Sequence, residues 1–321
     1  MNEHSLGVVA IGRNEGERLR RCLQSLLPGP AVVVYVDSGS DDGSPELARQ
    51  LGAEVVALDM ARPFTAARAR NEGFQRLLQL APDVEFVQFV DGDCEVVSGW
   101  LPVAVDFLQR HPAYAVVCGR RRERYPERSI YNRMCDQEWN TPVGDAKSCG
   151  GDALFRVSAF QALGGYRNGL IAGEEPELCI RLRQRGWKVH RLDHDMTLHD
   201  AAMTRLGQWW KRSVRAGHAY GEGAWLHGAL PERHWVRETL RALVWGAGIP
   251  LAAAFLVAGF GASGLALLVV YPLQWLRFWA RSRSFALAGF LVLGKFAEAM
   301  GVIQFHAGRL AGRGGRIIEY K

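Results

Sequence analysis

Residues 86–96, FVQFVDGDCEV, place an apolar run directly before two aspartates that one glycine separates. The run Phe86–Val90 predicts a buried strand, because a short apolar segment ending at a turn signal suits a strand covered on both faces. Asp91 and Asp93 then lie at the carboxyl end of that strand, where open α/β sheets bind ligands. Two carboxylates held so close repel each other unless a cation neutralises them, so the pattern favours a divalent metal site. A plain Asp-Gly-Asp turn is the alternative, because turns prefer the same residues.

Upstream of this stretch, apolar strands alternate with helical patterns over residues 6–27, 31–52 and 53–80. This alternation predicts an α/β fold with a mostly parallel sheet and helices on both faces. The loops after the strands then share one edge of the sheet. A dinucleotide-binding fold would show GxGxxG after its first strand, whereas residues 11–16 read IGRNEG, which does not match.

The loop over residues 37–44 allows two interpretations that hold together. Ser44, followed by Pro45 and Glu46, predicts the N-cap of a helix. That capping pattern does not explain Asp37. A carboxylate at a strand end can accept two hydrogen bonds from the edge of a base such as uracil or guanine, so Asp37 is a candidate for nucleotide recognition.

The chain's second region is markedly more apolar than its first. Residues 242–276 contain no Asp, Glu, Lys or Arg over 35 positions. This length is long for one membrane span and short for two, and the central GFGASG (259–264) favours a tight helical hairpin. A second apolar stretch, 285–305, carries Lys295 and Glu298 at a spacing that allows them to pair on a helix. A buried hairpin of a soluble protein is the alternative to membrane insertion.

Basic residues flank these apolar stretches, and by the positive-inside tendency they are predicted to lie on the cytoplasmic side of a membrane. They are Arg233, Arg237, Arg241, Arg277, Arg281, Arg283, Arg309, Arg313, Arg316 and Lys321. The net charge of +6 therefore indicates anionic membrane lipid as a partner and no nucleic acid. The six cysteines form no CxxC pair, which argues against a zinc site or a disulfide framework. The N-terminal residues lack the pattern of a signal peptide.

Six segments in order resemble family 2 glycosyltransferases, which have the nucleotide-sugar-binding GT-A fold. They are AIGRNEGERL (10–19), VYVDSGSDDGS (34–44), ARARNEG (67–73), FVDGDCEV (89–96), CGGDALFRVSAFQALGGY (149–166) and GEEPELCIRLRQRGW (173–187). The resemblance covers about residues 6–220. It implies a Rossmann-like GT-A domain over 1–225. The charge pattern described above predicts a basic connector over 226–241 and a membrane-associated helical region over 242–321, with the hairpin at 242–276 and the further apolar segment at 285–305.

The resemblance also implies roles for particular residues. Asp93, Asp91 and His199 would hold Mn²⁺ or Mg²⁺, Glu175 with its neighbour Glu174 would be catalytic, and Glu175 would be the general base. The implied nucleotide-sugar-binding residues are Asn14, Glu15, Asp37, Ser38, Arg70, Asp91, Gly92, Gly151 and Arg212. Arg212, beside Trp209 and Trp210, is equally interpretable as part of an interfacial membrane anchor. The basic segment 118–140 is either a solvated face or a site for lipid phosphate.

The function that this resemblance implies is inverting transfer of a sugar from a UDP- or GDP-linked donor to an acceptor hydroxyl. The acceptor is expected to be lipid-linked or a cell-envelope glycan, at the cytoplasmic face of the membrane. A polyprenyl-phosphate sugar synthase and an inactive membrane scaffold of the same fold are the alternatives. Two departures from the family pattern stand out: glutamate replaces aspartate at Glu175, and QWWKRSVRAG (208–217) only partly resembles the Gln-x-x-Arg-Trp of processive synthases.

Overall fold

The computed structural model describes residues 5–27 and 29–312. The chain divides into two compact units, which are described separately here. The first contains residues up to 127 together with 135–170 and 174–202, and the second contains 128–134, 171–173 and the residues from 203 onward. Arg313, Arg316 and Lys321 of the last basic cluster lie outside the described residues.

The first unit is built on one mixed sheet. Its order within the described residues is β3-β2-β1-β4-β8-β6-β9-β5, and β7 pairs with β9. The strands are β1 (Leu6–Gly12), β2 (Val32–Asp37), β3 (Glu54–Ala57), β4 (Phe86–Asp91), β5 (Cys94–Val96), β6 (Tyr114–Glu123), β7 (Gly144–Ala146), β8 (Ala153–Arg156) and β9 (Lys188–His199).

Strands β3, β2, β1 and β4 run parallel to one another, as the alternating pattern predicts. The later strands add both antiparallel and parallel pairs: β8 is antiparallel to β4 and β6, whereas β9 is parallel to β6 and antiparallel to β5 and β7. The predicted α/β class is confirmed. Because β1, β2 and β4 are parallel neighbours, their carboxyl ends meet at one edge of the sheet.

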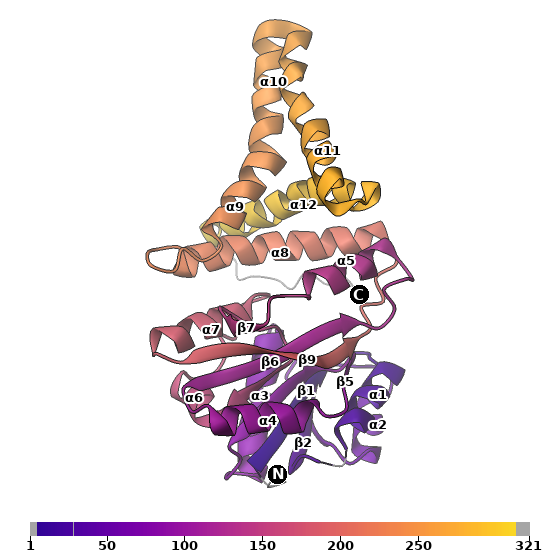
Figure 1. The fold of residues 1–321 in the computed structure, drawn as a ribbon, viewed down its shortest axis with the longest axis vertical. Coiled ribbons are helices and arrows are strands. Elements are labelled where there is room, and N and C mark those ends of the chain that lie inside the picture. The colour runs from indigo at the N-terminus through magenta and orange to yellow at the C-terminus, as the bar shows by residue number, and fades with distance from the viewer. Residues whose placement is uncertain (1–4, 28, 313–321) are drawn as a thin grey trace. The chain divides into compact units, whose positions relative to one another are not determined.

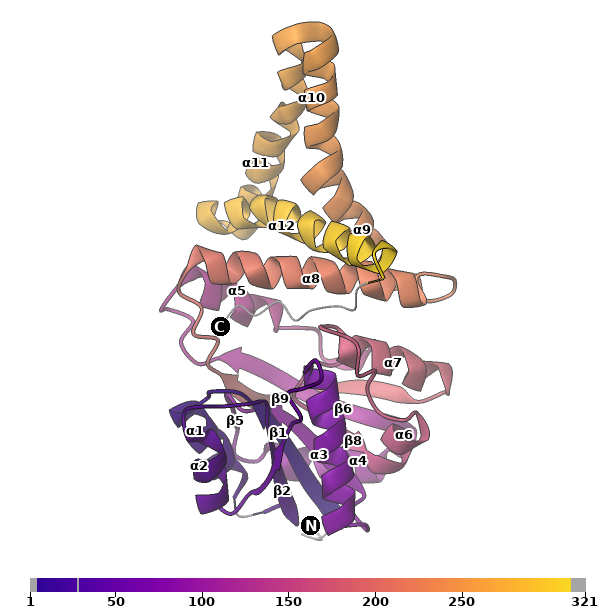
Figure 2. The ribbon, with the colours of Figure 1, turned by 180° about the vertical axis from the view of Figure 1, so that it is seen from behind.

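Helices cover both faces of this sheet. Those of the first unit are α1 (Glu17–Leu26), α2 (Ser44–Gln50), α3 (Ala66–Leu80), α4 (Trp100–Arg110), α6 (Val157–Ala162) and α7 (Glu174–Gln184), and α5 (Ile130–Glu138) spans the division between the units. Figures 1 and 2 show α4 and α3 on opposite faces. The core below α3 is aromatic, with Phe74, Phe89, Phe155 and Phe160 in mutual ring contact.

One predicted helix cap is wrong. Helix α2 begins at Ser44 with Gly43 as its N-cap, and the Ser44 hydroxyl has no hydrogen-bond partner among the described residues. Asp42 Oδ1 instead accepts the backbone N–H of Ser44 at 3.0 Å. The preceding aspartate reaches this donor because Gly43 takes a left-handed conformation, with φ of 80°.

The second unit is helical. It contains α8 (Leu206–His227), α9 (Val236–Leu243), a π-helical turn (Val244–Gly248), α10 (Ile249–Phe260), a 3-10 stretch (Gly261–Val269), α11 (Val270–Ser282) and α12 (Phe285–Leu310). The chain reverses at Gly261, whose φ is 68°, so α10 and α11 form the two arms of a hairpin (Figure 1). Gly261 lies within the GFGASG segment singled out above.

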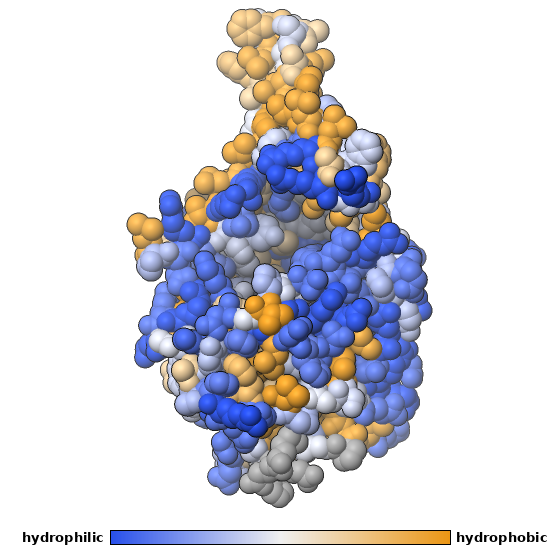
Figure 3. All heavy atoms as spheres, viewed as in Figure 1, coloured by the Kyte–Doolittle hydropathy of each residue, from blue (hydrophilic) through white to orange (hydrophobic). Residues whose placement is uncertain are grey.

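Two stretches of this unit are long and apolar enough to cross a membrane: Val236–Ser282, which includes the reversal, and Phe285–Leu310. Only 11% of the most apolar window of the first is buried, and Phe255 and Phe260 are more than 70% exposed. Figure 3 shows the resulting hydrophobic surface along the hairpin. A buried core helix of a soluble protein would instead hide these side chains.

Helix α12 packs along α8 through small residues. A Cβ on Gly217 of α8 would collide with the backbone of Glu298, and one on Gly301 of α12 would collide with the carbonyl of Val214. The backbones therefore approach closely only because both positions are glycine. The predicted pair on α12 is confirmed, since Lys295 Nζ lies 2.5 Å from Glu298 Oε2.

Candidate functional site

The candidate site lies in the first unit, at the carboxyl ends of β1, β2 and β4. The backbone N–H of Gly92 donates to Ile11 at 2.7 Å, and that of Ser38 donates to Gly12 at 3.0 Å, so the three strand ends are held together. A Cβ on Gly92 would lie 3.1 Å from the Ile11 carbonyl oxygen. The glycine between the two aspartates therefore lets the β4–β5 turn press against β1.

Asp37 at the end of β2 organises its own loop. Its Oδ2 accepts the N–H groups of Gly39 and Ser40 at 3.0 and 2.9 Å, and its Oδ1 accepts the Tyr35 hydroxyl at 3.2 Å. Asn14 connects the first loop to this one, because its side chain accepts the N–H of Asp41. The loop is thereby held in place at the strand edge, beside the end of β1.

Asp91 is held between two arginines. Arg70 Nη2 lies 2.7 Å from its Oδ1, and Arg121 Nη2 lies 3.0 Å from its Oδ2. Burial by itself raises the pKa of Asp91, but the charges of Arg70 and Arg121 outweigh it and hold that pKa well below its ordinary value. Asp91 is therefore an anion whose two oxygens are both engaged in ion pairs.

Asp152 is a fully buried anchor beneath Asp91. Its Oδ1 accepts the backbone N–H of Asp91 at 3.0 Å, and its Oδ2 accepts Arg121 Nε at 2.9 Å and the Thr197 hydroxyl at 2.7 Å. Arg121 thus joins two carboxylates that would otherwise repel each other. Its guanidinium also lies 5.6 Å from the ring centre of Trp139.

Arg70, from α3, also binds the two acids at the start of α7. Its Nη1 lies 2.8 Å from Glu174 and 3.1 Å from Glu175. Burial, followed by the neighbouring charge of Glu174, raises the pKa of Glu175 to about 7 despite the nearby Arg70. The Glu174 side chain is 5% exposed and that of Glu175 is 13% exposed, so Glu175 is the more accessible of the two.

Gly151 allows this convergence. A Cβ at that position would lie 2.5 Å from Arg70 Nη2, 3.1 Å from Asp91 Oδ2 and 3.2 Å from Glu175 Oε1. Any side chain would therefore enter the space where the arginine meets the two carboxylates. The nucleotide-sugar-binding role predicted for Gly151 stays a prediction.

Asp93 and His199 meet through the pairing of β5 with β9, in which Cys94 lies opposite His199. His199 Nε2 is 3.2 Å from Asp93 Oδ2, and Glu123 Oε2 lies 3.6 Å from the other ring nitrogen. Both Asp93 and His199 are buried. Two residues more than 100 positions apart thus place a carboxylate and an imidazole side by side.

Cys94 lies in the same cluster, with its Sγ 3.5 Å from Asp93. Burial and the charge of Asp152 raise the pKa of the Cys94 thiol well above its ordinary value. A second group, Asp91, Cys94 and Asp152, is also close-set, but both of its carboxylates are paired with Arg121.

Glu15 lies against the Asp-Gly-Asp turn, since a Cβ on Gly92 would be 3.4 Å from its Cγ, and it forms an ion pair with Arg18 at 2.8 Å. Ser38 is buried directly after β2, and Arg212 lies on α8 in the second unit. The roles assigned to all the predicted site residues stay predictions.

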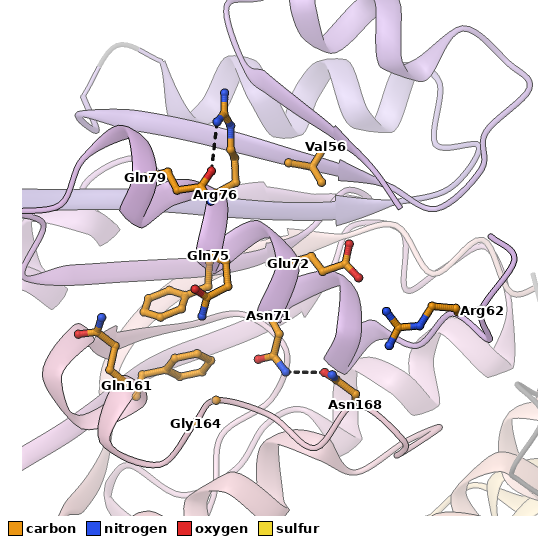
Figure 4. A pocket seen from close by; sticks show the side chains of 13 residues that line it. Val56, Arg62, Asn71, Glu72, Gln75, Arg76, Gln79, Gln161, Gly164 and Asn168 are labelled. Carbon is orange, nitrogen blue, oxygen red and sulfur yellow. Dashed lines mark hydrogen bonds between the residues drawn. The ribbon is translucent and has the colours of Figure 1, made fainter. Parts of the chain in front are cut away.

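A separate cavity of about 760 Å³ lies against α3 and the loop after α6 (Figure 4). Asn71 holds that loop: its side chain donates to the Tyr166 carbonyl at 2.7 Å and to Asn168 Oδ1 at 2.6 Å. Two adjacent residues of α3 therefore have different roles. Arg70 binds the acidic residues of the candidate site, and Asn71 holds the loop after α6.

Arg121, Asp152 and Glu123 are site residues that the sequence did not single out. Arg121 and Glu123 belong to the basic segment 118–140, and nothing in the run RRRER distinguishes these two inward-facing side chains from their neighbours. Asp152 directly follows the Gly-Gly pair 150–151, which was the available signal. Alternation along β6 separates Arg121, whose side chain is 16% exposed, from Arg122, which is 47% exposed.

Comparisons with known proteins identify related sequences and structures. Residues 8–164 match the family model described as glycosyl transferase family 2. Succinoglycan biosynthesis protein ExoA of Rhizobium meliloti is 26% identical over 189 residues, which is 55% of this chain and 55% of ExoA. Glycosyltransferase AglE of Haloferax volcanii is 26% identical over 219 residues, which is 64% of this chain and 69% of AglE.

Among solved structures, the mannosyltransferase PcManGT of Pyrobaculum calidifontis, in complex with GDP-Man and Mn²⁺, superimposes with a TM-score of 0.65. The superposition covers 94% of this chain and 87% of PcManGT, at 16% sequence identity, and it shows that the two share the GT-A fold. Together with the related glycosyltransferases and this fold, the family match shows that residues 8–164 form a glycosyltransferase family 2 domain.

Proposed function

We propose that this protein transfers a sugar, with inversion, from a nucleotide-diphosphate sugar to an acceptor hydroxyl. The observation that carries the proposal is the position of Arg70, which binds both Asp91 at the end of β4 and the acids Glu174 and Glu175 at the start of α7. Arg70 thereby brings Glu175, a carboxylate of raised pKa, to the strand edge where the family binds its donor. Sugar transfer from a nucleotide sugar needs a base and a donor-binding edge at the same place.

In this proposal Glu175 is the general base. It accepts the proton of the acceptor hydroxyl as that oxygen attacks the anomeric carbon from the side opposite the diphosphate. The bond between the anomeric carbon and the diphosphate oxygen breaks, and its electron pair leaves with the diphosphate. A base whose pKa is about 7 suits this step near neutral pH. Glu174 is a positioning residue that fixes Arg70.

The Asp93 and His199 pair suits a divalent metal. A buried carboxylate and an imidazole 3.2 Å apart match Mn²⁺ better than Mg²⁺, because Mg²⁺ prefers oxygen ligands throughout. Glu123, beside the far nitrogen of His199, would orient the ring. When bound, the metal would neutralise the charge that develops on the departing diphosphate. PcManGT, which shares the fold, was solved with Mn²⁺ and GDP-Man.

Membrane attachment is the second part of the proposal. The exposed apolar hairpin supports it, because a surface of this kind in water would be an aggregation site. The basic residues at both ends of the hairpin support a cytoplasmic position for the catalytic unit. A lipid-linked or envelope-glycan acceptor suits an enzyme held at that surface, and ExoA is itself a polysaccharide biosynthesis protein.

The first test is thermal stabilisation of the detergent-solubilised protein by UDP, GDP, CDP and dTDP, each with Mn²⁺ and with EDTA. We expect one nucleotide to raise the melting temperature only with Mn²⁺. Turnover of the corresponding nucleotide sugar is then measured for wild type and Glu175→Gln. The variant should keep the nucleotide-induced shift and lose transfer by ~10²-fold, the effect of removing a general base.

Glu46→Gln is the matched control, since Glu46 is an exposed acid in the first turn of a helix, as Glu175 is near the start of its own. It should transfer like wild type. A fully active Glu175→Gln removes the base assignment. If no nucleotide raises the melting temperature in a metal-dependent manner, the assignment of a donor-binding site is wrong and the scaffold alternative is favoured.

A further inference from the structure

A cavity of about 440 Å³ lies in the second unit, at the base of the apolar hairpin. Four cationic residues line it: Arg241 from the end of α9, Arg277 and Arg281 from α11, and Lys295 from α12. Trp245 and Phe278 contribute apolar walls. The cavity therefore combines a concentrated positive charge with a hydrophobic lining.

The hairpin itself creates this concentration of charge. Arg241 is the last charged residue before the uncharged segment 242–276, and Arg277 is the first one after it. Reversal at Gly261 returns the chain to its starting level, so residues 36 positions apart line one cavity. Figure 3 shows hydrophilic residues gathered at the base of the otherwise hydrophobic hairpin. If the hairpin enters a bilayer, this base lies at the level of the lipid headgroups.

Most of this charge has no counterion within the protein. Lys295 is paired with Glu298 at 2.5 Å. Within residues 5–27 and 29–312, no ion pair or hydrogen bond links the side chain of Arg241, Arg277 or Arg281 to another residue. Three guanidinium groups facing one cavity repel one another, and a bound anion would relieve that repulsion.

We propose that this cavity binds the phosphate headgroup of an anionic bilayer phospholipid. Guanidinium groups pair with phosphate oxygens in a bidentate manner, which suits Arg277 and Arg281 one helical turn apart. The apolar walls formed by Trp245 and Phe278 suit the glycerol and upper acyl region of a lipid, which a soluble phosphate lacks. The site is distinct from the donor site, and the proposal does not depend on catalysis.

Native mass spectrometry of the full-length protein in detergent tests the proposal, with phosphatidylglycerol and phosphatidylcholine as probes. We expect selective binding of phosphatidylglycerol. Arg277→Gln/Arg281→Gln should weaken that binding by about 20-fold, and Arg241→Gln by about fivefold, from the usual contribution of one arginine near an anionic lipid. All three side chains are exposed, so the melting temperature without lipid should not fall.

Arg237→Gln is the matched control, because Arg237 lies one turn before Arg241 on the same helix, is equally exposed and does not line the cavity. It should bind phosphatidylglycerol within twofold of wild type. Equal losses in Arg237→Gln and Arg241→Gln, or unchanged binding in the double variant, would overturn the proposal. Binding of glycerol 3-phosphate more tightly than phosphatidylglycerol would assign the cavity to a soluble anion. Binding of a polyprenyl phosphate more tightly than phosphatidylglycerol would assign it to the acceptor lipid. Either result would also overturn the proposal.

Discussion

The two aspartates of one Asp-Gly-Asp turn have different surroundings. Asp91 lies between Arg70 and Arg121, each of which binds one of its carboxylate oxygens. Asp93, two residues later, faces His199 on β9. The difference teaches that the repulsion between paired carboxylates can be relieved by two kinds of cation in one site: fixed guanidinium groups for one acid, and a metal for the other in our proposal.

This contrast also reconciles the two interpretations of the motif. The turn exists, because β4 ends at Asp91 and β5 begins at Cys94. The same turn sends successive acids toward different partners, since Gly92 packs against β1 between them. The structural and functional explanations of these residues are therefore not exclusive.

The largest expected effect separates the two aspartates directly. Asp93→Asn should lower metal-dependent donor turnover by on the order of 10³-fold, because it removes a proposed ligand to the ion that neutralises the diphosphate. It should also abolish the Mn²⁺-dependent thermal shift by nucleotide. Asp91→Asn should keep a measurable Mn²⁺-dependent shift. Equal loss of the shift in both variants would show that the two acids share one role.

The second prediction concerns the stability that the ion pairs of Arg121 give to the fold. Arg121→Gln should lower the free energy of unfolding by about 3–5 kcal/mol, because it leaves the buried Asp152 and Asp91 without this charge partner. Guanidinium denaturation of the detergent-solubilised protein, followed by tryptophan fluorescence, measures this change. Arg122→Gln on the same strand is the control: its pair with Asp195 is largely exposed, so its effect should stay below about 1 kcal/mol. Similar values for both variants would refute the anchoring role of Arg121.

The smallest effect is a pH dependence that separates Asp91 from Glu175, both of which contact Arg70. The pKa of Glu175 is raised to about 7, and a base must be ionised, so kcat should fall roughly tenfold for each pH unit below 7. Asp91, with its lowered pKa, stays ionised throughout this range. Steady-state rates between pH 5.5 and 8.5 measure the profile.

Glu174→Gln removes the like charge beside Glu175 and should move the midpoint of that profile to lower pH. A profile that is flat in wild type, or a midpoint that does not move in Glu174→Gln, would contradict the assignment of Glu175 as the titrating base.

The fold was predictable because its signals are local. Strand β4, helix α3 and the parallel arrangement of the first strands follow from short apolar runs that alternate with helical patterns. The predicted cap at Ser44 failed because Gly43 lets Asp42 reach the same N–H, and the sequence alone does not distinguish between two adjacent polar residues.

The site was predictable only in part. Asp93 and Glu175 occur in segments whose order is characteristic of the family. The fold places Asp93 beside His199, which the resemblance grouped with it, and Glu175 beside Arg70, a pairing that the resemblance did not imply. Arg121 and Asp152 escaped prediction because their importance comes from burial. Arg121 is one of five charged residues in RRRER, and only the pleat of β6 and its pairing with β9 turn it toward the buried Asp152.

The sequence by itself determined the class of fold, the strand end that carries the two aspartates, and the uncharged segment 242–276, because these depend on residue type and spacing along the chain. Only the tertiary structure decided which charges meet: Arg70 with Asp91 and Glu175, His199 with Asp93, and the three arginines around the hairpin cavity. The physical reason is that electrostatic interactions depend on distance and burial, and pairs distant in sequence acquire both only when the chain folds.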